Sequence, residues 1–89
     1  MINKYLIVEF GLKIRKLRDK KGISQEELSF ITGFHRTYIG MIERGERNIS
    51  LTNMAVFAKV FELNLSALLD FETLNTFEKY QTKIQNNVK

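Results

Sequence analysis

The sequence contains no cysteine, no proline and no tryptophan, and it has a single histidine. Without cysteine the chain forms neither a disulfide nor a cysteine-based metal site, and one histidine cannot make a zinc site on its own. No phosphate-cradling Gly-rich loop and no His-Glu-x-x-His motif is present either. We therefore predict that the protein is not an enzyme, and we expect no metal, no other cofactor and no small-molecule ligand.

Long apolar runs are also missing. The run Leu6-Ile7-Val8 is followed at once by Glu9 and soon by Lys13, far short of the length that spans a bilayer. No small-residue cleavage site follows it. These features predict a soluble, cytoplasmic protein. The 89 residues suggest one domain near the small end of what folds alone, so self-association would add stability.

Positive charge is concentrated in the first half of the chain. Residues 1–50 carry ten Lys and Arg against six Asp and Glu, whereas residues 51–89 carry four of each kind. A positive face favours binding to polyanions through counterion release, but it carries no sequence preference. Since many Lys-rich helix faces are merely solvated, charge alone leaves nucleic-acid binding open.

Apolar residues at helical spacing, separated by short turns, predict an all-α fold of five helices. The second helix is expected to begin at a capping box, in which Ser24 and Glu27 bond to each other's backbone amides. The expected helices span about residues 4–20, 25–32, 36–44, 51–62 and 66–84, followed by a frayed tail at 85–89. Caps are expected at Ser50 or Thr52 for the fourth helix and at Ser66 for the fifth.

The turns support the same division of the chain into helices. Gly33 ends the second helix, and only about two residues separate it from the next helical pattern, which leaves room for nothing but a sharp turn. Gly45 supplies a left-handed exit from the third helix. The fourth helix is expected to bury one apolar face, made of Leu51, Met54, Ala55, Ala58 and Phe61.

Two short helices joined by a tight Gly-containing turn form a helix-turn-helix, whose second helix enters the DNA major groove. Residues 25–44, QEELSFITGFHRTYIGMIER, resemble the helix-turn-helix of the lambda repressor and Cro class, the XRE family. The opening Gln-Glu-Glu-Leu, the turn Gly, Ile-x-x-Ile and Glu-Arg-Gly fall at the family's spacing. Ser29 stands where the family usually has Ala. Over about residues 10–70, the resemblance implies a single five-helix lambda-repressor-like DNA-binding domain within residues 1–84, with an extended C-terminal helix.

Within that family, residues 36–51, RTYIGMIERGERNISL, most resemble the controller proteins of restriction-modification systems. Those are small homodimeric regulators that bind operators upstream of their own and the endonuclease genes. The resemblance implies a transcriptional regulator that acts as a dimer on a pseudo-palindromic operator in double-stranded DNA, activating by contact with RNA polymerase and repressing by occlusion. Related cores occur elsewhere, so a phage-type repressor and an antitoxin-type module that binds a partner protein remain alternatives.

The predicted recognition helix supplies the candidates for base reading, which are Arg36, Thr37, Gly40 and Met41. An arginine can bond to O6 and N7 of guanine, and Thr37 or Met41 can pack on a thymine methyl. Gly40 lowers helix stability, so we infer that it allows close approach of DNA or of a neighbouring side chain. The simpler alternatives are that Arg36 is a solvated surface charge and that Met41 fills the edge of the core.

Candidates for contacts to the DNA backbone are Gln25, His35, Tyr38, Arg44, Arg47, Asn48 and Ser50. Gln25 opens a helix whose N-terminal amides also donate to phosphates, and Arg47 can reach a minor-groove edge. The alternatives are structural: a solvated Gln25, a merely exposed His35 and a half-buried Tyr38 ring with its hydroxyl in solvent. Arg44 and Arg47 could instead form a surface network with Glu43 and Glu46.

A cluster of apolar residues near the end of the chain predicts a homodimer interface. The cluster is more apolar than a small monomer needs, and it consists of Leu63, Leu65, Leu68, Leu69 and Phe71. A two-fold partner places two recognition helices one DNA turn apart, about 34 Å. Some of these residues are expected to belong to the core, and the antitoxin alternative would use the same region to grip a partner.

Overall fold

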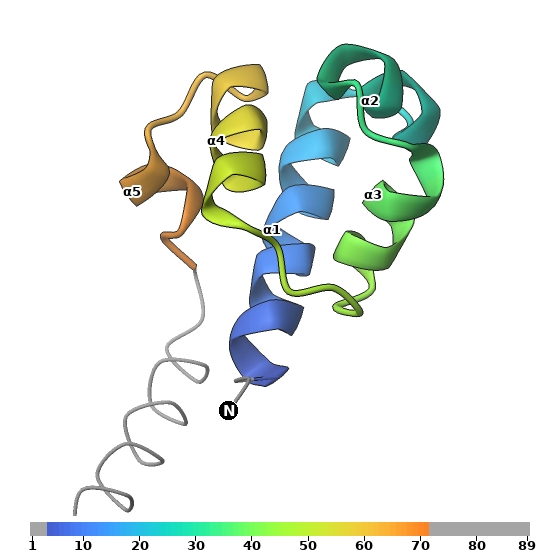
Figure 1. Ribbon diagram of the computed structural model, residues 1–89. Helices are drawn as coiled ribbons and strands as arrows, with labels where there is room; N and C mark the ends of the chain where they lie inside the picture. The colour runs from blue at the N-terminus through green and yellow to red at the C-terminus, as the bar shows by residue number, and fades with distance from the viewer. Residues whose placement is uncertain (1–3, 72–89) are drawn as a thin grey trace, which may run out of the picture.

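The computed structural model describes residues 4–71, and this part of the chain contains five α-helices and no strand. The helices are α1 Lys4–Lys21, α2 Gln25–Thr32, α3 Arg36–Glu43, α4 Leu51–Val60 and α5 Leu65–Leu68. Figure 1 shows α1 running through the middle, with α2 and α3 on one side and α4 and α5 on the other. The predicted all-α class is confirmed. None of these helices has the length and apolar character needed to cross a membrane.

The helix-turn-helix is built by local hydrogen bonds. The Ser24 hydroxyl accepts from the Glu27 amide at 3.0 Å, and the Glu27 carboxylate accepts from the Ser24 amide at 2.8 Å, which confirms the predicted capping box. Gly33 ends α2 with φ of 82° in the left-handed region. The Ser29 hydroxyl donates to the Phe34 carbonyl at 2.6 Å, so the residue that departs from the family pattern ties α2 to the turn.

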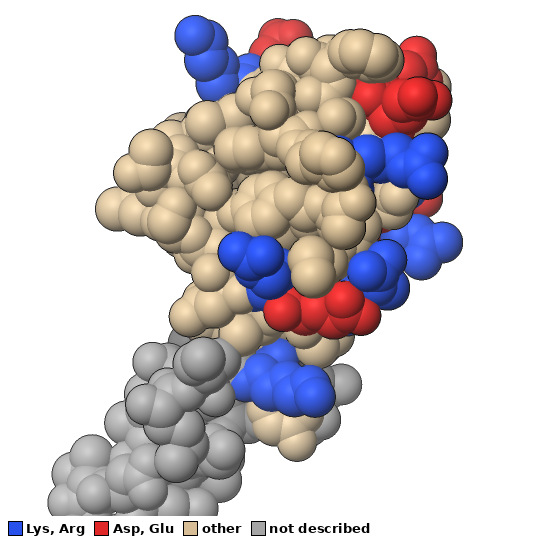
Figure 2. Space-filling view, turned by 45° about the vertical axis from the view of Figure 1, so that its right-hand side comes forward, with Lys and Arg blue, Asp and Glu red and all other residues tan. Residues whose placement is uncertain are grey.

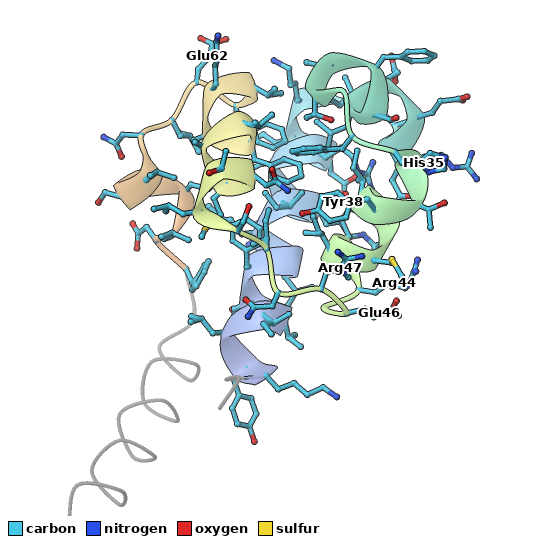
Figure 3. All side chains as sticks on the ribbon, viewed as in Figure 1. His35, Tyr38, Arg44, Glu46, Arg47 and Glu62 are labelled. Atoms are coloured by element: carbon cyan, nitrogen blue, oxygen red, sulfur yellow. The ribbon has the colours of Figure 1, made fainter. Side chains whose placement is uncertain are left out.

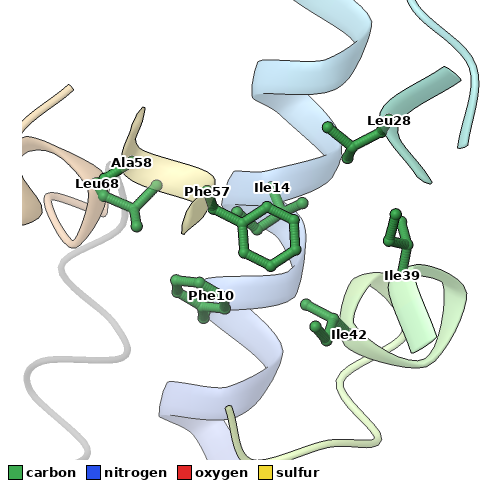
Figure 4. Close-up of a cluster of buried hydrophobic side chains, with 8 residues drawn as sticks. All are labelled: Phe10, Ile14, Leu28, Ile39, Ile42, Phe57, Ala58 and Leu68. Atoms are coloured by element: carbon green, nitrogen blue, oxygen red, sulfur yellow. The ribbon is translucent and has the colours of Figure 1, made fainter. Parts of the chain in front are cut away.

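One hydrophobic core joins all five helices (Figure 4). Its buried members are Phe10 and Ile14 from α1, Leu28 from α2, Ile39 and Ile42 from α3, Phe57 and Ala58 from α4, and Leu68 from α5. Burial of apolar side chains contributes about 1.5–3 kcal/mol for each large residue. The recognition helix α3 is therefore held in place by two core residues rather than by its turns alone.

Helix α1 lies very close to the end of α3 at Gly11. A Cβ atom on Gly11 would overlap the backbone carbonyl oxygen of Ile42 and lie 3.0 Å from that of Glu43. Only a residue without a side chain lets α1 lie this close to the end of α3. Gly11 therefore sets the spacing between the central helix and the recognition helix.

The prediction for α4 was partly wrong. Its N-cap is Ser50, but Leu51 is 64% exposed and Ala55 is exposed as well, so neither belongs to the buried face. Ala58 is buried as predicted, and Met54 and Phe61 are half-buried against the core. The main core residue of α4 is Phe57, which was not predicted and whose ring packs edge-on against that of Phe10 in α1 (Figure 4).

The region after α4 also differs from the prediction. The cap of α5 is Asn64, whose side-chain oxygen accepts from the Ala67 amide at 2.7 Å, and not Ser66. The helix ends at Leu68 and does not continue through Phe71 as expected, because the chain tightens after Leu69: the Asp70 amide donates to the Ala67 carbonyl, three residues back, at 3.2 Å. The remainder of the expected helix, 72–84, and the expected tail lie outside the described residues.

Candidate nucleic-acid interface

Both ends of the recognition helix α3 are capped. At its start the Nδ1 atom of His35 accepts from the Thr37 amide at 3.1 Å. At its end Gly45, with φ of 73°, donates to Ile42, and the Glu46 amide donates to Met41 at 2.8 Å. These are the two bonds of a Schellman motif, and they confirm the predicted left-handed exit. His35 is exposed and also caps α3, and when its ring is neutral the Nε2–H remains free to donate outward.

Arg36 and Thr37 form the exposed first turn of α3. Within residues 4–71 the Arg36 guanidinium makes no hydrogen bond and no ion pair, so its donors face solvent. Met41, one turn further on, is half-buried. Figure 2 shows the face that carries α2, α3 and the following loop, where basic and acidic side chains alternate on the surface. The structure thus leaves Arg36 available for a ligand outside the protein.

Gly40 is buried, unlike the other predicted base-reading residues. A Cβ at this position would lie 3.1 Å from an Arg44 guanidinium nitrogen and 3.8 Å from the Gln25 side-chain oxygen. Of the two roles predicted for Gly40, the structure supports close approach of a neighbouring side chain. Gly40 is therefore not on the exposed surface with Arg36.

A buried network ties α1, α2 and α3 together beneath this surface. The Glu43 carboxylate accepts from Arg18 at 2.7 and 3.1 Å and from the Gln25 amide nitrogen at 3.0 Å. The Glu43 side chain is 4% exposed and that of Arg18 is 13% exposed. The hydrogen bond to Glu43 raises the pKa of Arg18 above its usual value. Glu43 is thus not part of a surface network, and Gln25 is not merely solvated.

An exposed ion pair follows α3. Arg44 donates to the Glu46 carboxylate at 2.9 and 3.2 Å, and this hydrogen bond raises the pKa of Arg44 and lowers that of Glu46. The alternative of a surface network is therefore correct for Arg44 and Glu46. It is wrong for Glu43, which is buried with Arg18, and no ion pair of Arg47 is found among the described residues.

Arg47 lies instead over the ring of Tyr38, with its guanidinium carbon 5.1 Å from the ring centre (Figure 3). The Tyr38 hydroxyl accepts from the Asn53 side chain at 2.9 Å, so it is not simply in solvent as the alternative expected. The backbone N–H of Asn53 donates to the Ser50 hydroxyl at 3.1 Å, whereas Asn48 is exposed and makes no side-chain hydrogen bond within the described region. The basic loop after α3 is thereby fixed against the recognition helix.

Three residues of this site were missed from the sequence: Gly11, Arg18 and Asn53. No local signal marks them, because each acts on a residue far away in the chain. For Glu43 the sequence indicated the wrong network, since its spacing from Arg44 and Glu46 fits a surface pair equally well.

The predicted dimer residues do not all reach the surface. Leu68 is fully buried in the core, so the prediction that it contacts a partner was wrong. Leu63, Leu65 and Phe71 are half-buried and pack against the core. Leu69 is 41% exposed and is the member of the set that projects most.

We expect Glu46→Gln to strengthen binding to any DNA duplex, because it removes a negative charge from this face and leaves a phosphate without a carboxylate competing for Arg44. The phosphate contact of Arg44 is then neutralised more fully, and the slope of log affinity against log salt steepens by up to about 0.9. Titration of a random duplex at several salt concentrations measures both effects. Glu62→Gln is the matched control, because Glu62 lies at the far end of α4 from these residues (Figure 3). Weaker binding by Glu46→Gln would show instead that the ion pair positions Arg44.

Comparisons with known proteins agree with this geometry. The helix-turn-helix family matches residues 14–68. The control protein C.BamHI of Bacillus amyloliquefaciens is 45% identical over 71 residues, covering 79% of this chain and 88% of that protein. The restriction-modification controller protein C.AhdI from Aeromonas hydrophila has a crystal structure that superposes with a TM-score of 0.66 at 44% identity, covering 70% of this chain and 94% of that one.

A third similar structure is the tetramer of the controller protein C.Esp1396I in complex with its natural 35 base-pair operator. It is 31% identical with a TM-score of 0.65, covering 72% of this chain and 88% of that one. The chain therefore belongs to the helix-turn-helix family. Within that family it belongs with the restriction-modification control proteins, which confirms the resemblance read from residues 36–51.

Proposed function

We propose that this protein is the controller of a restriction-modification system, a cytoplasmic regulator that binds operator DNA specifically and has no catalytic activity. The observation that carries the proposal is Arg36: it lies in the exposed first turn of α3 with no hydrogen-bond or ion-pair partner among residues 4–71, on a helix whose other side is buried and capped. A rigid helix that presents a free guanidinium at its N-terminal end fits the reading of a guanine edge in the major groove.

Around Arg36, the proposed contacts divide by chemistry. Thr37 and Met41 flank it on α3 and would pack against or bond to neighbouring bases. The phosphates on either side would be bound by charged and polar side chains whose donors the structure leaves at least partly available: Gln25, His35, Arg44, Arg47, Asn48 and Ser50. Gln25 would donate its second amide hydrogen. Tyr38 would join this set if Arg47 moves off its ring.

The regulator acts in this proposal as a dimer on a pseudo-palindromic operator upstream of its own gene. Occupancy of that site represses by occlusion, and contact with RNA polymerase activates. The protein's own concentration sets the balance between activation and repression, because occupancy of the operator rises more steeply with protein concentration when two protomers bind than when one binds. The C.Esp1396I relative, which is named as a tetramer on its operator, supports assembly of more than one protomer on DNA.

The test is a titration of the DNA immediately upstream of the gene against a random duplex at several salt concentrations. We expect Arg36→Ala to cost about 1–3 kcal/mol on the upstream DNA and much less on the random duplex, because a lost base contact weakens only the specific site. Arg44→Ala is the matched substitution, since it is expected to weaken both duplexes alike, as a phosphate contact does.

Two outcomes would overturn the proposal. Equal binding of wild-type protein to both duplexes would remove sequence-specific recognition, and a protein-binding module of the antitoxin type would become the better explanation. Equal weakening of both duplexes by Arg36→Ala would make Arg36 a phosphate contact and move base reading away from the first turn of α3.

A further inference from the structure

The phenol of Tyr38 is held by three contacts from different parts of the chain. The Phe34 ring packs edge-on against it, with ring centres 5.2 Å apart and an angle of 70° between the planes. The Arg47 guanidinium lies over the ring face (Figure 3), and the Asn53 side chain reaches the hydroxyl from α4. The ring is thereby fixed by the turn before α3, the loop after it and the first turn of α4.

The contact between Asn53 and Tyr38 has a direction. The side-chain amide nitrogen of Asn53 donates to the phenolic oxygen at 2.9 Å. A phenol can accept one hydrogen bond and donate another, so this bond occupies the oxygen and leaves the hydroxyl hydrogen unused. Among residues 4–71 no acceptor for that hydrogen is found. The hydrogen is therefore available to an acceptor outside the protein.

Asn53 is itself held firmly. It is the third residue of α4, where its backbone N–H donates to the hydroxyl of the cap Ser50 at 3.1 Å. The same helix is anchored in the core by Phe57 and Ala58. The donor to the phenol is thus carried by a fixed helix and not by the loop that carries Arg47. If Arg47 moves off the ring, Asn53 still holds the phenolic oxygen.

Tyr38 follows the exposed residues Arg36 and Thr37 on α3, and it keeps part of its own surface in solvent. Phosphate oxygens accept hydrogen bonds and donate none, so a side chain with a spare hydrogen beside the base-reading residues fits them. We propose that Asn53 is a positioning residue, which fixes the Tyr38 hydroxyl so that its hydrogen donates to a phosphate of the bound duplex. Asn53 itself does not contact DNA. The inference rests on the proposed function, since it takes the ligand to be DNA.

The substitution Asn53→Asp reverses the hydrogen bond and keeps the shape of the side chain. A carboxylate only accepts, so the Tyr38 hydroxyl would donate to the new carboxylate and lose its hydrogen for a phosphate. An acidic residue is favoured in the first turn of a helix, so we expect α4 to stay folded, which circular dichroism checks. Thr52→Asp is the matched control, because Thr52 is exposed in the same turn and the substitution adds the same charge there.

The first measurement is the affinity for a random duplex, because a phosphate contact carries no sequence preference. Wild type, Asn53→Asp and Thr52→Asp are each compared with and without Tyr38→Phe. We expect Tyr38→Phe to weaken binding about tenfold in wild type and in Thr52→Asp, as the loss of one hydrogen bond to a charged group does. In Asn53→Asp the same substitution should change the affinity by less than about twofold, and this coupling is what a double-mutant cycle isolates.

The second measurement is a Raman spectrum of the protein without DNA, which reports the direction of the hydrogen bond. The intensity ratio of the tyrosine Fermi doublet is high when the phenol accepts a hydrogen bond and low when it donates one. Subtracting the spectrum of Tyr38→Phe removes the signals of the other tyrosines. We expect the Tyr38 ratio to fall in Asn53→Asp and to stay unchanged in Thr52→Asp.

An unchanged ratio in Asn53→Asp would mean that Asn53 already accepts from the phenol, and it would overturn the proposal. Equal weakening by Tyr38→Phe in all three backgrounds would overturn it as well, because the hydroxyl would then reach a phosphate without Asn53. No effect of Tyr38→Phe in wild type would reduce Asn53 to a tie between α3 and α4. Operator recognition by Arg36 would stand in each case, since it is measured as the difference between upstream and random DNA. Equal binding to those two duplexes would overturn the proposed function and leave this phosphate contact standing.

Discussion

Glu43→Ala is expected to lower the free energy of unfolding by about 3–5 kcal/mol, the cost of breaking a buried ion pair by removing one partner. The Arg18 guanidinium, in a side chain only 13% exposed, would keep only its longer pair with the exposed Asp19 carboxylate at 3.4 Å, and the Gln25 amide would lose its acceptor. The effect should reach function as well, because this network joins the recognition helix to α1 and α2.

Urea unfolding followed by circular dichroism measures the change. Glu46→Ala is the matched control, because it breaks an ion pair of similar geometry on the open surface, where we expect almost no change in stability. The double variant Arg18→Met with Glu43→Leu should recover most of the loss, since it leaves no buried charge unpaired. A neutral Glu43→Ala would show that the pair does not stabilise the fold.

Gly11→Ala is expected to destabilise the protein by about 3 kcal/mol, the upper end of the cost of overpacking. The added methyl group would overlap the Ile42 carbonyl oxygen, which belongs to the backbone and cannot turn aside. That oxygen also accepts from the Gly45 amide at 3.0 Å. Moving it would therefore disturb the C-terminal end of α3 together with the packing of α1.

Gly40→Ala is the control for Gly11→Ala. Both glycines lie inside helices, where alanine is favoured by about 0.5–1 kcal/mol, so propensity alone predicts that both substitutions stabilise. At Gly40 the nearest atom is the end of the flexible Arg44 side chain, which is 59% exposed and can shift. Chemical unfolding should therefore show that Gly40→Ala raises the free energy of unfolding and that Gly11→Ala lowers it. Equal effects would mean that the close helix contact at Gly11 does not cause the destabilisation.

The features predicted correctly from the sequence are local ones. The capping box joins residues three apart, and the left-handed turns fall on glycines at helix ends, so residue type and spacing were enough. Where two capping residues lie close together, the same reasoning was ambiguous. Asn64 and Ser66 are both good caps, and nothing in the local sequence distinguishes them.

The features that were missed are contacts between helices. Arg18 and Glu43 are 25 residues apart, and nothing in their spacing distinguishes a buried pair from two surface charges. Leu68 shows the same limit for apolar residues, because a leucine has the same pattern in a core as in an interface. Arg36 could be singled out because its proposed partner is DNA, so its role required no knowledge of contacts within the protein.

Arg36 and Thr37 keep exposed side chains in the first turn of α3, whereas the rest of that helix is built into the core and its caps. The residues that we propose choose the operator are therefore not the residues that keep the protein folded. Substitutions at these two positions can change operator preference without a compensating change elsewhere. The same scaffold can thus serve restriction systems with unrelated operators, and libraries randomised at only these two positions should yield folded proteins throughout.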